Sequence, residues 1–168
     1  RVSLVGSEMC IRDSCNPDGN FNHNPEPLPE NITDLCSEVK RGKYQLGIVV
    51  DPDADRLVLV DERGEPFGEE YTLVAAAEYL LSKNHGASTC SNLSSTLALK
   101  NITEKYGGKY FSSAVGEINV VQVMKEKKCL IGGEGNGGVI YPMTHYGRDS
   151  LIAVSYTHRR CRRNRSCR

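Results

Sequence analysis

Three aspartates lie close together near the middle of the chain, in the stretch "VVDPDADRLVLV". Asp51, Asp53 and Asp55 alternate with a proline and an alanine, and an apolar run lies on either side of them. Carboxylates at this spacing repel one another strongly unless they face water or share a cation. Carboxylate oxygens are ligands that Mg²⁺ and Ca²⁺ prefer, so this aspartate loop is a candidate site for a divalent cation.

Three interpretations of the aspartate loop compete. The first is a solvated acidic turn, which needs no ligand. The second is a calcium loop of the EF-hand type, with Glu62 as its glutamate, but Arg56 stands where that loop needs glycine and strands are expected where it needs helices. The third is a catalytic Mg²⁺ site at the carboxyl end of a strand, where open α/β sheets bind ligands. Arg56 favours the third, because a guanidinium beside metal-binding carboxylates suits a phosphate group that the metal also touches.

A second candidate site is the glycine-rich stretch "IGGEGNGGVIY". Its glycines, Gly133 and Gly135 among them, let a backbone approach a ligand closely, and they surround Glu134 and Asn136. A carboxylate and an amide presented together suit two neighbouring sugar hydroxyls. A dinucleotide-binding loop is a poor match, because a strand is expected after the glycines where a helix should open. A plain hairpin loop remains the alternative to ligand binding.

The elements that must position these loops alternate between helices and strands. Apolar residues at helical spacing predict helices, and continuous β-branched runs predict strands. The alternation predicts an α/β fold with mixed, mainly parallel sheets and flanking helices. The expected elements are a helix over 32–42, a strand buried on both faces over 44–50, a strand and turn over 56–67, a helix over 73–81, a strand over 87–93, a helix with hydroxyl caps over 94–106, a strand over 109–115, a helix over 118–128 capped by Asn119, two strands joined by the glycine loop over 129–142, and a helix start over 147–153.

Composition excludes several classes of protein. With 39% hydrophobic and 25% charged residues in 168, the chain is typical of a soluble globular protein. No run approaches the roughly 18 apolar residues of a membrane helix, and no secretory signal is recognisable. The seven cysteines form no C-x-x-C pair, which indicates reduced thiols without a zinc site or a disulfide framework. A cytoplasmic protein that binds no membrane is therefore expected.

The two ends of the chain differ from its middle. Residues 1–14 and 154–168 resemble translated sequencing-adapter sequence, and we expect both segments to be non-native. The last eleven residues carry six arginines, and without them 15 basic residues face 21 acidic ones. A nucleic-acid-binding arm is the alternative interpretation of this tail, but no nucleic-acid partner is expected. Residues 15–66 and 67–153 then form two domain-sized units.

The order and spacing of the two loops resemble a known family. "DPDADR", followed about eighty residues later by "GGEGNGG", is similar to the α-D-phosphohexomutases, which are phosphoglucomutases, phosphomannomutases and phosphoglucosamine mutases. "PDGNFNHNPEPLPEN" resembles the segment upstream of the metal loop in bacterial members. By this resemblance, residues 15–66 are the later part of the family's second domain and residues 67–153 are its third domain.

The resemblance also implies an activity and its site residues. The family transfers a phosphoryl group from an enzyme phosphoserine to a hexose phosphate, through a hexose 1,6-bisphosphate intermediate. The matching positions are Asp51, Asp53 and Asp55 as Mg²⁺ ligands, Arg56 as the active-site arginine near the transferring phosphate, and Glu134 and Asn136, with Gly133 and Gly135, as the sugar-recognition loop.

The nucleophilic serine has no counterpart in this chain, so we expect an internal fragment that is inactive without the missing domains. Residues 94–96 should line the substrate side of the third domain. Leu97 stands where relatives often carry a basic residue, and Glu117 stands where some members carry a histidine, which leaves open which hexose phosphate is bound. Arg148 is expected to be an ordinary surface residue, and contact with a substrate is the alternative. The alternative function is a non-catalytic module that binds sugar phosphates or divalent ions.

Overall fold

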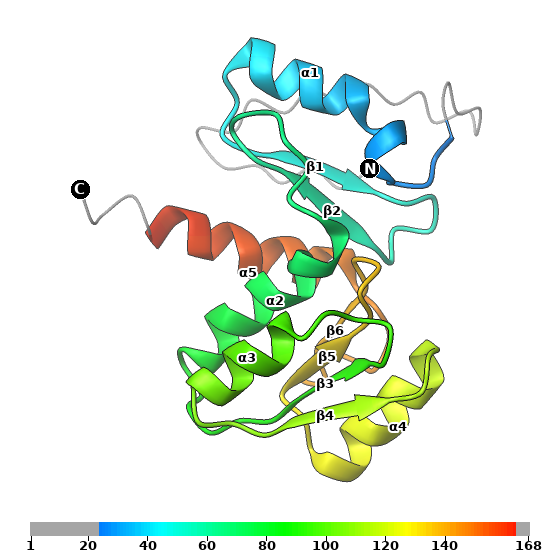
Figure 1. Ribbon diagram of the computed structural model, residues 1–168, viewed down its shortest axis with the longest axis vertical. Coiled ribbons are helices and arrows are strands. Elements are labelled where there is room, and N and C mark those ends of the chain that lie inside the picture. The colour runs from blue at the N-terminus through cyan, green and yellow to red at the C-terminus, as the bar shows by residue number, and fades with distance from the viewer. Residues whose placement is uncertain (1–23, 164–168) are drawn as a thin grey trace.

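The computed structural model describes residues 24–163, with side chains through Tyr156. The expected segment 1–14, the beginning of the proline-rich loop and the last five residues lie outside the described residues. Two parts are visible in Figure 1, a smaller one containing α1, β1 and β2 and a larger one containing the remaining elements. In the part of the chain that is described, no helix is both long and apolar enough to cross a membrane.

The smaller part is one helix on a two-stranded sheet. After a short 3₁₀ turn, Pro29–Asn31, helix α1 spans Thr33–Gly42 and confirms the helix expected over 32–42. Strands β1, Gly47–Val50, and β2, Leu57–Val60, pair antiparallel. Apolar side chains from α1 and β2 bury one another, and the buried residues of this cluster are Ile32, Val39, Val58 and Val60.

The prediction that strand 44–50 is buried on both faces is wrong. Ile48 and Val50 of β1 remain 42% and 43% exposed. The strand with both faces covered is β2, whose four residues are all buried. β1 pairs with β2 alone among the described strands, so one of its edges has no partner there. A run of branched apolar residues predicts a strand, but it does not show which faces other elements will cover.

The larger part is a four-stranded sheet between helices. Its strands lie in the order β4-β3-β5-β6, and β3 pairs parallel with β4 and β5 whereas β6 is antiparallel to β5. This arrangement confirms the predicted mixed, mainly parallel sheet with flanking helices. The strands are β3, Thr89–Asn92, β4, Tyr110–Ser113, β5, Ile131–Gly133, and β6, Val139–Ile140. The helices are α2, Glu69–Leu81, α3, Ala98–Lys105, α4, Glu117–Lys127, and α5, Ser150–Arg163.

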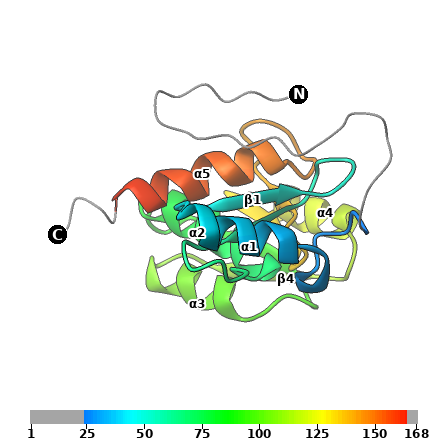
Figure 2. The same ribbon diagram turned by 90° about the horizontal axis from the view of Figure 1, so that it is seen from above.

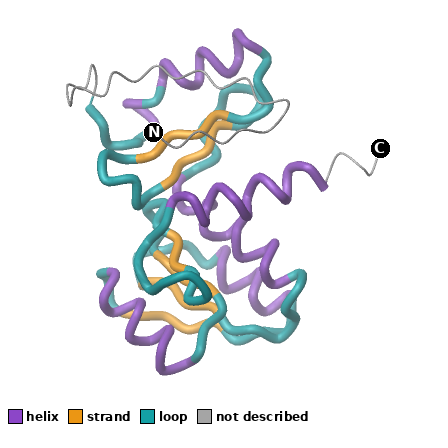
Figure 3. Tube along the Cα trace, turned by 180° about the vertical axis from the view of Figure 1, so that it is seen from behind, coloured by secondary structure: helices purple, strands orange, loops and turns teal. Residues whose placement is uncertain are grey.

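The helices form separate layers on the sheet. The cluster around Leu73, Leu81 and Leu99 joins α2 and α3 to β5, while Met124 of α4 is buried against Cys90 of β3 on the other face. Seen from above, α5 runs alongside α2 (Figure 2). The view from behind shows the two groups of strands as distinct sheets, with α5 extending out from the boundary between them (Figure 3).

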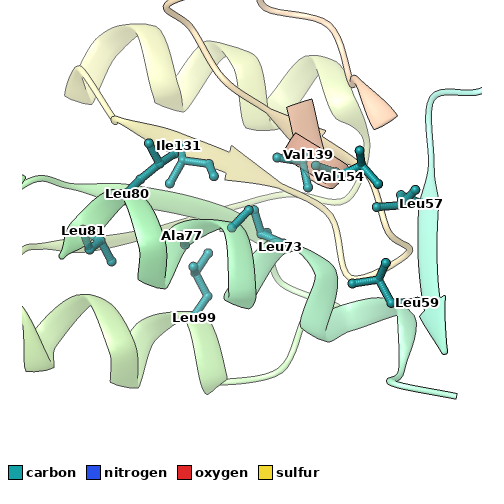
Figure 4. Close-up of a cluster of buried hydrophobic side chains, with 12 residues drawn as sticks. Leu57, Leu59, Leu73, Ala77, Leu80, Leu81, Leu99, Ile131, Val139 and Val154 are labelled. Carbon is teal, nitrogen blue, oxygen red and sulfur yellow. The ribbon is translucent and has the colours of Figure 1, made fainter. Parts of the chain in front are cut away.

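One hydrophobic core connects the two parts. Figure 4 shows Leu57 and Leu59 of β2 near Leu73 of α2 and Val154 of α5. Leu57 is 1% exposed, although it belongs to the smaller part. The expected boundary between residues 153 and 154 falls inside α5, and the helix continues across it. The shared core holds β2, and the loop that precedes it, against the larger part.

Neither of the two expected helix caps forms. The Thr96 hydroxyl accepts a hydrogen bond from the Ala98 backbone N–H at 3.3 Å, but the N-cap of α3 is Leu97, which has no capping side chain, so the expected hydroxyl cap of α3 is wrong. The Asn119 cap is wrong, because α4 begins at Glu117 and Gly116 is its N-cap. The Asn119 side chain instead donates to the Val115 carbonyl at 2.8 Å. The helix therefore starts one residue before the range 118–128 that the sequence predicted.

Candidate functional site

The aspartate loop connects β1 to β2. Asp51, Asp53 and Asp55 each offer one carboxylate oxygen within 4.8 Å of the others. Asp51 is buried, Asp53 is exposed and Asp55 is half-buried. Ala54 turns the chain with φ +57°, and its N–H donates to the Asp51 carbonyl at 3.0 Å. The structure therefore brings together the three carboxylates that the sequence proposed as metal ligands.

Asp51 anchors this loop from the inside. Its Oδ1 accepts hydrogen bonds from the backbone N–H groups of Asp55, at 3.1 Å, and Arg56, at 3.0 Å. Its Oδ2 accepts from Arg56 Nε at 2.6 Å. Burial alone would raise the pKa of Asp51, but the hydrogen bonds and charge of Arg56 outweigh it and lower the pKa. Asp51 is thus an ionised carboxylate held in one orientation.

The two carboxylate oxygens of Asp55 have different surroundings. Its Oδ2 forms an ion pair with Arg148 Nη2, whereas its Oδ1 is buried and accepts no hydrogen bond. Burial raises the pKa of Asp55, Arg148 opposes this, and the charges of Asp51 and Asp53 add to the increase. A buried carboxylate oxygen without a partner calls for an explanation. A hard divalent cation shared by the three aspartates supplies one, so these residues fit a Mg²⁺ or Ca²⁺ ion.

Arg56 lies beside the aspartates as predicted, but carboxylates already surround it. Its guanidinium contacts Asp51 at 2.6 Å, Glu26 at 3.5 Å and Asp55 at 3.9 Å, and its side chain is 25% exposed. The hydrogen bond to Asp51 raises the pKa of Arg56 further. A phosphate group that binds Arg56 would therefore share it with these carboxylates.

The glycine loop joins β5 to β6, and a hydrogen bond to the side chain of Asn136 stabilises its turn. Asn136 Oδ1 accepts a hydrogen bond from the Gly138 N–H at 3.2 Å. A side chain at Gly133 would place its Cβ 2.1 Å from the Gly138 carbonyl oxygen, so the hairpin requires glycine there. A Cβ at Gly135 would lie 3.3 Å from Ser95 Oγ, which shows how closely this loop approaches the loop after β3.

Glu134 is buried in this hairpin, with 6% of its surface exposed. Its Oε1 accepts hydrogen bonds from Asn92 Nδ2 at 2.9 Å and from the Gly116 N–H at 3.2 Å, and its Oε2 accepts from Arg148 Nη1 at 3.4 Å. Each carboxylate oxygen has about two lone-pair sites. A sugar hydroxyl at Glu134 would therefore bind beside existing partners.

The carboxyl ends of the parallel strands collect polar side chains at one edge of the sheet. Asn92 ends β3, and Glu134 follows β5. Asn92 also accepts a hydrogen bond from Ser95 Oγ at 2.6 Å, which places Ser95 within reach of the glycine loop. Its neighbours Ser94 and Thr96 are exposed. The sequence analysis missed Asn92, whose only signal was its position at the end of a predicted strand.

Backbone contacts hold the aspartate loop and the glycine loop together. The Leu57 N–H donates to the Gly137 carbonyl at 3.1 Å, and Arg56 forms a β-bridge with Gly138. Ser150 Oγ, at the start of α5, donates to the Ala54 carbonyl at 2.6 Å. Segments about eighty residues apart in the sequence are therefore adjacent in one site.

The prediction that Arg148 has an ordinary surface role is wrong. Its side chain is only 19% exposed and forms ion pairs with Asp55, with Glu117 at 3.3 Å and with Glu134 at 3.4 Å. Its backbone N–H also donates to Glu117 Oε1 at 3.1 Å. A lone arginine before a helix start carried no sequence signal for this role, because its partners come from three distant segments.

The charges of this site are unbalanced. Among the described residues, five carboxylates, those of Glu26, Asp51, Asp55, Glu117 and Glu134, lie within 4.0 Å of two guanidinium groups, those of Arg56 and Arg148. Asp53 adds a further carboxylate to the aspartate cluster. Such an excess of negative charge attracts a cation.

The layered α/β fold, with an acidic loop and a glycine-rich hairpin meeting at one edge, defines a domain pair found in a known class of enzymes. Residues 68–165 match the family model for phosphoglucomutase/phosphomannomutase, alpha/beta/alpha domain III, and residues 3–64 match the model for domain II. The chain belongs to the phosphoglucomutase/phosphomannomutase family. The matched ranges include most of residues 1–14 and 154–168, whose non-native origin stays a prediction.

Curated relatives agree with this assignment. The chain is 31% identical over 153 residues to a probable phosphoglucosamine mutase of Methanopyrus kandleri, covering 90% of this chain and 34% of that protein. It is 34% identical over 143 residues to a phosphoglucomutase/phosphomannomutase of Thermococcus kodakarensis, covering 84% of this chain and 31% of that protein. The chain thus spans about a third of the length of the curated relatives it matches.

Solved structures show the same fold. A putative phosphomannomutase from Thermus thermophilus superimposes with a TM-score of 0.74 at 28% identity, over 80% of this chain and 31% of that one. A phosphoglucomutase/phosphomannomutase family protein from Burkholderia thailandensis gives a TM-score of 0.71 at 30% identity, over 79% of this chain and 29% of that one.

Proposed function

We propose that this chain is an internal portion of a Mg²⁺-dependent phosphohexomutase, an intramolecular phosphotransferase that interconverts hexose 1-phosphates and 6-phosphates. The observation that carries the proposal is the adjacency of the two loops. The aspartate cluster, with the unpartnered Asp55 Oδ1, meets the glutamate-bearing hairpin through Arg148. A cation site beside a polar hairpin suits a phosphorylated sugar, because the cation offsets the phosphate charge and the hairpin offers hydrogen-bond partners to the hydroxyls.

Each residue has a part in this proposal. Asp51, Asp53 and Asp55 would hold Mg²⁺, which when bound supplies positive charge that offsets the charge of a phosphoryl group. Arg56 holds Asp51 in place and would contact the phosphate. Glu134 would accept hydrogen bonds from a sugar hydroxyl. At the hairpin, Gly133, Gly135 and Asn136 would keep the backbone close to the sugar.

The rest of the proposal concerns the parts of the enzyme beyond this chain. The phosphoserine that exchanges phosphoryl groups, with hexose 1,6-bisphosphate as intermediate, would come from another domain of a full-length cytoplasmic enzyme of carbohydrate metabolism. The isolated chain should therefore have no mutase turnover. The names of the relatives include glucosamine, glucose and mannose enzymes, so the hexose is left open.

Calorimetric titration with Mg²⁺ tests the metal assignment. The chain should bind Mg²⁺ weakly, since the phosphoserine oxygen expected among the ligands is absent. Asp53→Asn should weaken binding further, and because Asp53 is exposed, this variant should fold normally. Asp34→Asn, the same change on an exposed residue of α1, is the matched control. An Asp53→Asn variant that titrates like the unaltered chain would show that the ligand assignment is wrong.

Two further measurements separate the proposal from the alternative, a non-catalytic binding module. Conversion of glucose 1-phosphate to glucose 6-phosphate by the isolated chain would contradict the absence of the nucleophile. A dedicated module should bind a sugar phosphate tightly by itself, whereas a mutase portion lacking the other domains should bind it weakly and only with Mg²⁺. Titration with glucose 6-phosphate, with and without Mg²⁺, distinguishes these outcomes.

A further inference from the structure

The side chain of Arg148 touches both loops of the site. It lies between β6 and α5, and its backbone forms a β-bridge with Ile140. Its guanidinium forms ion pairs with Asp55 of the aspartate loop and with Glu134 of the glycine loop. The planar guanidinium presents five N–H donors in fixed directions, whereas the ammonium of a lysine is a compact charge without that rigid geometry.

The contact with Asp55 distinguishes the two oxygens of that carboxylate. Arg148 Nη2 is paired with Oδ2, and Oδ1 is left buried without a hydrogen bond. Oδ1 is also 3.9 Å from Arg56 Nε, beyond hydrogen-bonding distance. Arg148 therefore satisfies one oxygen of Asp55 and leaves the other available within the aspartate cluster.

The opposite side of Arg148 is anchored to the strand edge of the larger part. Glu134, which it contacts, accepts a hydrogen bond from Asn92 at 2.9 Å, and Asn92 accepts one from Ser95 at 2.6 Å. Glu117 at the start of α4 pairs with Arg148 Nε at 3.3 Å. A continuous series of polar contacts thus extends from the loop after β3 to the aspartate loop.

We propose that Arg148 is a positioning residue, which ties the aspartate loop to the glycine loop and orients Asp55 so that its Oδ1 can bind the divalent cation. This inference rests on the proposed metal site. It gives Arg148 no contact with the cation itself. Partners that orient metal-binding carboxylates in this way typically change metal affinity by about 10–100-fold when they are removed.

A purely electrostatic role for Arg148 predicts the opposite sign. A positive charge near the site repels Mg²⁺, so removal of a mere counter-charge should strengthen Mg²⁺ binding. Removal of a positioning residue should weaken it, because Asp55 loses its fixed orientation and the glycine loop loses its tie to the aspartate loop. The direction of the change in Mg²⁺ affinity therefore separates the two roles.

The experiment measures Mg²⁺ binding to the full chain by calorimetry, and Mn²⁺ binding by electron paramagnetic resonance as a second readout. Arg148→Met should lower the affinity about tenfold. Arg148→Lys, which keeps the charge without the planar fork, should lower the affinity about threefold, to a value between those of the unaltered chain and Arg148→Met. Arg63→Met is the matched control, because Arg63 also pairs with two carboxylates, Asp61 and Glu65, but lies in an exposed turn. The Mg²⁺ affinity of this variant should equal that of the unaltered chain.

A double-mutant cycle tests whether Arg148 acts through Asp55. If it does, Arg148→Met should have little further effect in an Asp55→Asn background, since coupled changes are not additive. Equal or tighter binding by Arg148→Met, or an undiminished effect in the Asp55→Asn background, would overturn the inference. If circular dichroism shows that Arg148→Met does not fold, the test uses Arg148→Lys instead. A folded Arg148→Lys variant with the Mg²⁺ affinity of the unaltered chain would also overturn the inference. Failure of the unaltered chain to bind either ion would instead refute the proposed metal site.

Discussion

Replacement of Gly137 by alanine should destabilise the contact between the glycine loop and β2. Gly137 has φ +88°, and a Cβ there would lie 2.6 Å from the Leu57 carbonyl oxygen and 3.2 Å from the Leu57 nitrogen. Both neighbours are backbone atoms of a buried strand, so they cannot move aside cheaply. The displaced loop would also lose the 3.1 Å hydrogen bond from the Leu57 N–H to the Gly137 carbonyl.

The magnitude follows from two contributions. A left-handed backbone costs alanine roughly 1–2 kcal/mol, and a buried N–H left without a partner costs about 1–3 kcal/mol. Gly86→Ala isolates the first contribution, because Gly86 has φ +81° and nothing within 4 Å of its Cβ position. Both changes reduce the entropy of the unfolded chain equally, so this effect cancels in the comparison. Gly137→Ala should therefore be less stable than Gly86→Ala by about 1–3 kcal/mol.

Urea denaturation followed by circular dichroism measures this difference. With a slope of about 1–3 kcal/mol per molar urea, the midpoint of Gly137→Ala should lie about 1 M below that of Gly86→Ala. Coincident midpoints for the two variants would refute the reasoning, since they would show that the close approach of Gly137 to β2 contributes nothing beyond backbone strain.

Two further predictions concern the core and the cysteines. Leu57→Ala should lower the free energy of unfolding, measured by urea denaturation, by about 2–5 kcal/mol, because Leu57 is 1% exposed in the shared core. The control is Leu97→Ala, at a residue that is 66% exposed, and it should change this free energy by less than about 0.5 kcal/mol. Burial raises the pKa of Cys90 to about 12 and that of Cys129 to about 11, so their reactive thiolates are nearly absent at pH 8. Peptide mass spectrometry after iodoacetamide treatment should find both unlabelled and the more accessible Cys36 labelled; equal labelling would contradict their burial.

The elements of the fold were largely predictable because their signals are local. Residues 32–42 carry apolar side chains at helical spacing, and the structure has a helix at Thr33–Gly42. The hairpin around the glycine loop and the mainly parallel sheet were likewise predicted from short patterns. The errors concerned burial and helix ends, as with the exposed faces of β1 and the cap of α4, because they depend on which other elements cover a segment.

The candidate site was predictable only where its members are neighbours in the chain. Asp51, Asp53 and Asp55 are grouped by sequence alone, and the structure keeps them within 4.8 Å. Arg148 was assigned to the surface because its ion-pair partners lie 14, 31 and 93 residues away along the chain. No periodicity or short motif reports a contact of that kind.

The sequence by itself therefore determined the chemistry available to this protein: an acidic loop after a strand, a glutamate among glycines, and the α/β elements that carry them. Only the tertiary structure decided how that chemistry is combined. The shared core around Leu57 brings β2 against the larger part, and carboxylates of the adjacent loops then pair with the guanidinium groups of Arg56 and Arg148. The physical reason is that side-chain types and local backbone preferences are properties of short segments, whereas burial and ion pairing depend on segments that meet only when the chain folds.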